Sequence, residues 1–251
     1  MNMPKIALVT GASSGIGKAC ATALLNDGWH VVFVGRRAEL LQQAIAEAGA
    51  AGARGVAMPC DVADETAVAA LFDAVKQRFG RLDLLFNNAG VSLPVQTPDE
   101  IDAATWRRAV DVNLNGAFFC LSHAFRLMRA QQPQGGRIIN NGSISAHAPR
   151  PNSIAYTATK HAVTGITKTA SLDGRKYNIA VGQIDIGNVA SDMTARMVAG
   201  VPQADGSIKP EPRMAMDSVV ATFMTMARLP LESNILNVTV MASAMPFVGR
   251  G

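Results

Sequence analysis

The sequence predicts one α/β domain over residues 1–251, with a parallel sheet of about seven strands and helices on both of its faces. Short apolar runs alternate along the chain with longer stretches that have apolar residues at helical spacing. The short runs are almost continuously apolar, as expected for strands that are covered on both faces. Strands that alternate with helices favour a doubly wound parallel sheet.

Seven segments are predicted to be strands: Lys5–Val9, Val31–Val34, Gly55–Met58, Leu82–Phe86, Arg137–Asn141, Ile179–Ile184 and Ile235–Val240. Six segments between them are predicted to be helices: Gly15–Asn26, Ala38–Ala50, Glu65–Phe79, Thr105–Ala130, Ser153–Lys176 and Met216–Arg228. Glycine, Asp-Gly or proline follows several of these helices, and such residues commonly end a helix.

The longest irregular stretch, residues 188–213, is rich in glycine and proline. A break of this length in a compact domain is usually a functional loop, so we predict a substrate loop or lid. Met193, Met197, Val198 and Val201 are spaced for one short helix with an inward face. The alternatives are a plain surface excursion and a permanently docked helix.

The composition limits the class of protein. The 23 basic and 19 acidic residues give a net charge of +4, and the basic residues are scattered, which argues against a nucleic-acid partner. Cys20, Cys60 and Cys120 lie far apart without a CxxC pair, which argues against disulfides and a metal site. No apolar run approaches the roughly 18 residues of a membrane span. We therefore expect a soluble, cytoplasmic protein with no membrane partner.

The first predicted strand runs directly into the sequence TGASSGIG and then into a helix. Gly11, Gly15 and Gly17 let the backbone approach a pyrophosphate, and the helix offers unpaired N–H groups and the positive end of its dipole. This strand–turn–helix context predicts a Rossmann-type dinucleotide site. The alternative is a tight turn with a structural role alone.

The end of the second predicted strand indicates which dinucleotide binds. The strand ends in Gly35, Arg36 and Arg37 without a carboxylate, and Glu39 falls on the next helix. NAD sites usually place a carboxylate at this position, whereas the 2′-phosphate of NADP needs a cation. Arg36 can bind a phosphate through two hydrogen bonds, so we predict NADP(H). The alternative is that both arginines only begin a solvated helix.

Tyr156 and Lys160 lie four residues apart in a predicted helix and therefore share a face. A cation beside a phenol favours the phenolate, which suits a group that exchanges protons near neutral pH. This spacing alone is common in helices, so it carries weight only together with other motifs.

Those other motifs are present in order: TGASSGIG, NNAG at 87–90, VNLNG at 112–116, Ser143 after a strand, and YTATK at 156–160. Together they make the chain resemble the short-chain dehydrogenase/reductase family from Thr10 to at least Ser191. The resemblance implies that Tyr156 exchanges a proton with the substrate and that Ser143 binds the substrate oxygen. It also implies that Lys160 assists Tyr156 and holds the nicotinamide ribose, and that Asn113 keeps a water in a proton relay.

The resemblance also assigns the cofactor contacts. Asp61 would meet the adenine, and Asn87, Ala89 and Gly90 would line the adenosine side. With the glycine turn and the strand ends, the full predicted set is Gly11, Ser13, Ser14, Gly15, Ile16, Gly17, Arg36, Arg37, Asp61, Val62, Asn87, Ala89, Gly90, Tyr156, Lys160, Gly187, Val189 and Ser191.

Some positions depart from the family pattern or compete with it. Ile186 stands where the family usually has proline before Gly187, and Ser145 competes with Ser143, which is preferred for its 13-residue gap to Tyr156. His147 is expected to line the substrate pocket or to be solvated. The tail residues Met245, Pro246, Phe247 and Val248 look exposed and are candidates for contact with another subunit.

The expected function is hydride transfer between NADP(H) and the carbonyl or secondary alcohol of a small organic substrate. The family resemblance implies a homotetramer or homodimer that pairs through the helices at 105–130 and 153–176. Two alternatives stay open: an NAD-preferring alcohol dehydrogenase, and a binding protein that senses NADP(H) without turnover.

Overall fold

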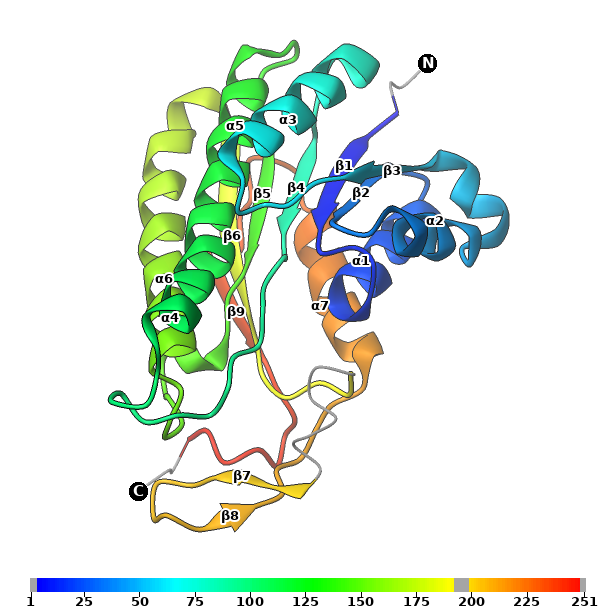
Figure 1. The fold of residues 1–251 in the computed structure, drawn as a ribbon. Coiled ribbons are helices and arrows are strands. Elements are labelled where there is room, and N and C mark those ends of the chain that lie inside the picture. Colours follow the sequence, from blue (N-terminus) through cyan, green and yellow to red (C-terminus); the bar gives the residue numbers. More distant parts are fainter. Residues whose placement is uncertain (1–3, 192–198, 249–251) are drawn as a thin grey trace.

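The computed structural model describes residues 4–191 and 199–248, and its centre is one parallel sheet (Figure 1). The strand order is β3-β2-β1-β4-β5-β6-β9. The bounds are β1 Ile6–Thr10, β2 His30–Gly35, β3 Gly55–Pro59, β4 Leu84–Asn87, β5 Gly136–Asn141, β6 Ile179–Ile186 and β9 Asn237–Val240. The predicted doubly wound sheet is confirmed, and the strand bounds differ from the prediction by two residues at most.

Helices cover both faces of the sheet. On one face lie α1 (Gly15–Asn26), α2 (Ala38–Ala46) and α7 (Met216–Arg228), and on the other lie α3 (Glu65–Phe79), α5 (Gly116–Ala130) and α6 (Ile154–Gly174) (Figure 1). Successive strand residues point to opposite faces. Ala7 and Val9 of β1 therefore join the core beneath α1 and α7, while Ile6 and Leu8 join the core beneath α3 and α5.

One predicted helix is wrong in its extent, and another has the predicted extent but contains a π turn. The helix predicted over 38–50 ends at Ala46, and a 3-10 turn at Gly49–Arg54 follows because Gly49 adopts a left-handed φ of 58°. The helix predicted over 105–130 consists of α4 (Ala103–Val110), a π turn at Asp111–Asn115, and α5.

The 188–213 segment contains a short antiparallel hairpin of β7 (Val201–Pro202) and β8 (Ile208–Lys209). Of the residues predicted to form one short helix, Val201 is buried in β7, which contradicts its helical placement. Met193, Met197 and Val198 lie outside the described residues. None of the helices in the described ranges is both long and apolar enough to cross a membrane.

The ring of Phe223 joins α7 to the sheet. It packs on Phe86 of β4 with 4.5 Å between the ring centroids, and both side chains are fully buried. Removing a buried phenylalanine ring usually costs about 3–5 kcal/mol.

We expect Phe223→Ala to lower the free energy of unfolding by about 3–5 kcal/mol in urea denaturation. The exposed Ile208 on β8 provides a control, because Ile208→Ala removes apolar atoms from a site that is already 69% exposed. Equal losses in the two variants would contradict the assigned role of Phe223.

Candidate active site

A cavity of about 520 Å³ lies at the carboxyl edge of the sheet. It is lined by residues at or just after the carboxyl ends of β1 to β6, among them Gly11, Arg36, Cys60, Asn88 and Asn141. In parallel α/β sheets, ligands bind at this edge, where the strand order reverses. The order β2-β1-β4 places such a reversal between β1 and β4.

The glycine turn after β1 has a backbone that only glycine adopts easily. Gly11 and Gly15 have φ values of 68° and 54°. At Gly17 an added Cβ would lie 2.3 Å from the Gly11 carbonyl oxygen, so this position has no room for a side chain. No side chain caps α1 at Ser14, and its first N–H groups have no partners within the helix. This turn can therefore receive a pyrophosphate.

Thr10 and Asn88 hold the glycine turn against the next strand. The backbone N–H groups of Asn88 and Ala89 both donate to Thr10 Oγ1 at 2.9 Å, and Asn88 Nδ2 donates to the Thr10 carbonyl oxygen. Asn141 Nδ2 donates to Asn88 Oδ1 at 2.8 Å. One amide side chain thus joins the ends of β1, β4 and β5 at the centre of the cavity.

The sequence prediction named Asn87 for the cofactor, and the structure places its side chain elsewhere. Asn87 is buried and its Nδ2 donates to the Ala117 carbonyl oxygen and to Asn140 Oδ1, whereas Asn88 lines the cavity. The physical reason is strand alternation: adjacent residues at the end of β4 face opposite sides. Asn88 is the residue that the prediction missed, although the NNAG motif contains it.

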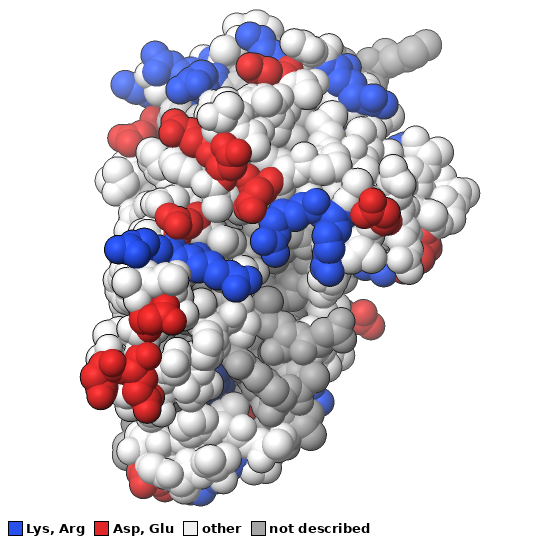
Figure 2. All heavy atoms as spheres, viewed as in Figure 1, with Lys and Arg blue, Asp and Glu red and all other residues white. Residues whose placement is uncertain are grey.

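At the end of the cavity next to β2 and β3, the lining includes Arg36, Arg37, Asp61 and Val62. Both arginines are exposed, and Glu39 lies in the first turn of α2, outside the cavity wall. A band of basic side chains crosses the middle of the face seen in Figure 2, with acidic side chains above and below it. A phosphate at the end of β2 can therefore meet two guanidinium groups and no strand-end carboxylate.

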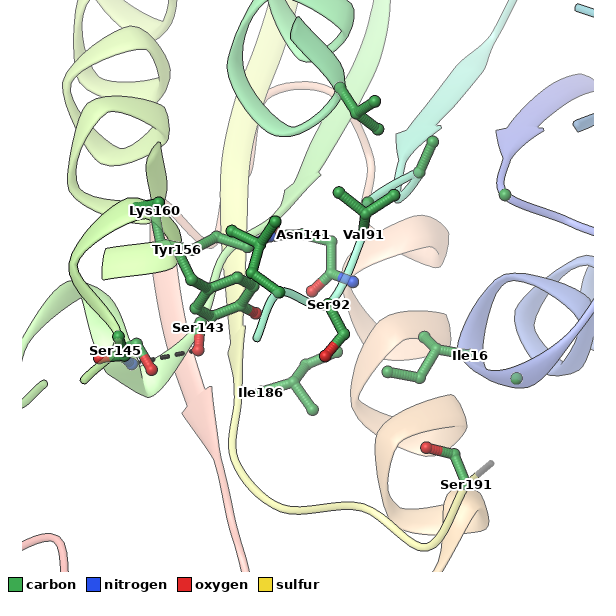
Figure 3. A pocket seen from close by; sticks show the side chains of 18 of the residues that line it. Ile16, Val91, Ser92, Asn141, Ser143, Ser145, Tyr156, Lys160, Ile186 and Ser191 are labelled. Atoms are coloured by element: carbon green, nitrogen blue, oxygen red, sulfur yellow. Dashed lines mark hydrogen bonds between the residues drawn. The ribbon is translucent and has the colours of Figure 1, made fainter. Parts of the chain in front are cut away.

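Ser143, Tyr156 and Lys160 lie together on one wall, and Ile16 and Ser191 lie across from them (Figure 3). Ser143 follows β5, and its Oγ accepts a hydrogen bond from the Ser145 N–H at 3.1 Å. Lys160 is buried, and its Nζ donates to the Asn141 carbonyl oxygen at 2.7 Å. That ammonium lies 5.6 Å from the centroid of the Tyr156 ring.

Asn113 sits in the π turn between α4 and α5, behind the cavity wall. Its Oδ1 accepts from the Val91 N–H at 2.8 Å and its Nδ2 donates to the Val91 carbonyl oxygen at 3.2 Å. The π turn interrupts the helical hydrogen bonds, and such turns often occur at functional sites. Asn113 thereby fixes the loop that forms the cavity wall after β4.

The opposite end of the cavity is lined by Ile186, Gly187, Val189 and Ser191. An added Cβ on Gly187 would lie 2.7 Å from the Met241 side chain, because the chain after β9 packs against it. In the C-terminal residues after β9, the prediction that Met245 is exposed is wrong, because its side chain is only 5% exposed and belongs to the chain's own core. Val248 is exposed as predicted.

Another part of the cavity wall is largely apolar and includes Leu93, Ile101, Ile144 and Val201. Arg150 also lines it, and its guanidinium forms an ion pair with the buried Glu211. Burial raises the pKa of Glu211, but hydrogen bonds from Arg150, Gln203 and Asn188 outweigh burial and leave that pKa below its usual value. Glu211 therefore fastens the chain after β8 to two other segments of the site.

Comparisons with known proteins agree with this fold. The family model for short chain dehydrogenase matches residues 5–201. The chain is 39% identical over 197 residues to 3beta-hydroxysteroid dehydrogenase of Mediterraneibacter gnavus, covering 78% of this chain and 70% of that protein. It is 35% identical over 191 residues to cyclohexanol dehydrogenase of Acinetobacter sp., covering 76% and 75%. The crystal structure of acetoin dehydrogenase YohF from Salmonella typhimurium superposes with a TM-score of 0.79 at 29% identity, covering 95% of each chain.

All three cysteines are buried and unpaired, and only Cys60 lines the cavity. Burial, with smaller effects from Asp61 and Asp64, raises the pKa of the Cys60 thiol to about 11. At pH 8 about one Cys60 thiol in a thousand is then ionised, against about a quarter of free cysteine thiols. Because the thiolate is the reactive form, alkylation should be slow.

We expect iodoacetamide to label Cys60 in the folded protein at pH 8 at least about 100-fold more slowly than in urea. The rate should rise about tenfold per pH unit between pH 8 and 10, since the thiolate fraction does. Mass spectrometry of the Cys60 peptide measures both. Fast labelling of folded protein at pH 8 would show that the thiol is exposed and unshifted.

Proposed function

The chain belongs to the short-chain dehydrogenase/reductase family, and we propose that it transfers a hydride between NADP(H) and the carbonyl or secondary alcohol carbon of a small organic substrate. The observation that supports this most is the single cavity described above. One wall offers the glycine turn and the N-terminus of α1, and the other carries Ser143, Tyr156 and Lys160 (Figure 3).

The cofactor, when bound, supplies or accepts the hydride. The glycine turn and the first turn of α1 would hold its pyrophosphate, and Lys160 and Val189 line the cavity where its nicotinamide half would lie. The absence of room for a side chain at Gly17 supports this fit, because the third glycine of such a site lets the start of the helix pack closely against the turn that would hold the phosphates.

Tyr156 would give its phenolic proton to a carbonyl oxygen, or take one from an alcohol. Its neighbour Lys160 is fixed by the Asn141 carbonyl oxygen, so the ammonium stays near the Tyr156 ring. Ser143 Oγ accepts from the Ser145 N–H, and its hydroxyl proton can point to the substrate oxygen as negative charge develops there. We propose that Asn113 supports the proton path by fixing the wall at Val91.

The substrate proposed for this site is uncharged and largely apolar. The described wall beyond Tyr156 is formed mainly by apolar side chains, and the guanidinium of Arg150 is already neutralised by Glu211. Relatives named for steroid and cyclohexanol substrates agree with this choice. We further propose that residues 188–213 form the substrate loop, because Gly200, Val201 and Pro202 line the cavity.

Tyr156→Phe removes the phenolic proton and leaves the ring. We expect kcat to fall by about 100-fold or more, the usual scale for a lost acid/base group, with NADPH affinity unchanged. The measurement is NADPH oxidation with a panel of ketones that includes cyclohexanone and acetoin. Wild-type turnover by a folded Tyr156→Phe variant would overturn the proposal, and failure of the wild-type protein on all ketones and alcohols would favour a cofactor-sensing protein.

Arg36→Ala tests the preference for NADP(H). Loss of a charged hydrogen bond to the 2′-phosphate should weaken NADPH binding by about 1.5–3 kcal/mol and leave NADH binding unchanged. Arg78→Ala on α3 is the matched control, because it removes the same charge from an exposed residue that does not line the cavity. Titration by calorimetry measures all three proteins. Equal losses for NADPH and NADH in Arg36→Ala would show that this arginine does not recognise the phosphate.

We propose that the protein self-associates through the faces of α4, α5 and α6. Trp106, Phe118 and Leu172 lie on these helices and are 39%, 49% and 58% exposed in the single chain. Large exposed apolar side chains on neighbouring helices are typical of an interface. Analytical ultracentrifugation should give a dimer or tetramer that Phe118→Arg dissociates, while Ile208→Arg should not. A monomeric wild-type protein would contradict this proposal.

A further inference from the structure

Asp185, near the carboxyl end of β6, is the most completely enclosed acidic side chain at this edge of the sheet, with 0% exposure. Its Oδ1 accepts hydrogen bonds from the Ser143 backbone N–H at 2.9 Å and from Gln183 Nε2 at 2.7 Å. Its Oδ2 accepts from His147 Nε2 and from Asn237 Nδ2, both at 2.7 Å. A carboxylate can only accept, so His147 carries its proton on Nε2.

These contacts reach both ends of one short turn. Ser143 precedes the 3-10 turn at Ile144–Ala146, and His147 ends it. The two oxygens of one carboxylate thus bind the backbone at the start of the turn and the side chain at its end. Within the turn, the Ser145 N–H donates to Ser143 Oγ, the hydroxyl that faces Tyr156 (Figure 3).

We propose that Asp185 and His147 are positioning residues that hold Ser143 Oγ in place against Tyr156. Neither residue lines the cavity, so neither acts on a bound molecule directly. The His147 side chain is 40% exposed and its ring meets Phe247 edge-on at 6.4 Å. Of the two expectations for His147, a solvated side chain is confirmed and a place in the pocket lining is wrong, and the buried Asp185 carboxylate is a partner that neither expectation included.

The Asp185 carboxylate packs directly against the backbone at Gly142. An added Cβ at Gly142 would lie 1.9 Å from Asp185 Oδ1 and 2.6 Å from Gln183 Nε2. The space beside Ser143 is therefore occupied by Asp185 itself, and a larger residue at 142 would displace the carboxylate. Gly142→Ala should consequently mimic the loss of Asp185.

The consequence for turnover follows from the geometry that Ser143 must keep. A displacement of a catalytic group by about 1 Å can cost up to about 100-fold in rate. Asp185→Asn keeps the shape of the side chain, but its Nδ2 faces two donors, His147 Nε2 and Asn237 Nδ2. His147→Phe keeps a ring against Phe247 and removes the donor to Asp185.

This inference rests on the proposed role of Ser143, and a double-mutant cycle separates the two. With the best substrate of the ketone panel, we expect Asp185→Asn and His147→Phe each to lower kcat by about 10- to 100-fold with unchanged NADPH affinity. In a Ser143→Ala background, Asp185→Asn should lower kcat no further, because its effect passes through Ser143. His161→Phe, which changes an exposed histidine on α6, is the matched control.

The outcomes of the double-mutant cycle distinguish a failure of the positioning role from a failure of the role proposed for Ser143. Independent, multiplicative losses in the cycle would overturn the positioning role while leaving the proposed function intact. No loss in Ser143→Ala alone would instead remove the proposed role of Ser143. Wild-type kcat in both Asp185→Asn and His147→Phe would overturn the inference directly.

Hydrogen exchange gives a readout that does not depend on turnover. The Ser143 N–H is bonded to Asp185 Oδ1, so amide exchange in the peptide 143–148 should accelerate at least about tenfold in Asp185→Ala, which removes both acceptor oxygens, and in Gly142→Ala, which displaces them. Peptides from α3, remote from this turn, report whether the variants remain folded. Unchanged exchange at 143–148 in both folded variants would show that Asp185 does not hold the turn.

Discussion

Buried hydrogen bonds between polar side chains lock the carboxyl edge of the sheet, and the cavity depends on them. Asn140 of β5 accepts from Asn87 of β4 and donates to Thr167 of α6, and Thr167 donates to Gln183 of β6. Gln183 then donates to Asp185. Burying a polar group in an apolar interior costs free energy unless the group is hydrogen-bonded, so each side chain in this series of hydrogen bonds fixes the next one. These hydrogen bonds thereby hold β4, β5, β6 and α6 in fixed positions relative to one another.

The hydrogen bonds at the carboxyl edge of the sheet hold two separate turns beside one cavity. Thr10 and Asn88 hold the glycine turn at the ends of β1 and β4. Asp185 holds the turn that follows Ser143, at the ends of β5 and β6. Asn141 connects the two halves, because its side chain donates to Asn88 and its carbonyl oxygen accepts from Lys160. A hydride donor and a proton donor must meet one substrate carbon and its oxygen, and such chemistry gains most from fixed geometry.

The side of the cavity that Arg150 lines is held by an ion pair in place of a chain of neutral hydrogen bonds. The chain after β8 reaches the site through one buried carboxylate, Glu211, which pairs with Arg150 and accepts from Asn188 and Gln203. Breaking such a pair leaves a buried charge without a partner, so it acts as a strong anchor even where its net contribution to stability is small.

The sequence by itself determined the elements and the chemistry that local patterns encode. Continuous apolar runs predicted the seven parallel strands, because both faces of such a strand are buried. The motifs around Gly11, Arg36, Ser143 and Tyr156 predicted which strand ends carry the site, because those residues act close to their own turn or helix.

Only the tertiary structure decided what depends on partners distant in sequence. Which of Asn87 and Asn88 faces the cavity follows from the face of β4, and the burial of Met245 follows from the packing of the tail on Gly187. The link between Ser143 and Asp185 spans 42 residues, and no periodicity or local motif encodes a contact that forms only when β5 and β6 pair.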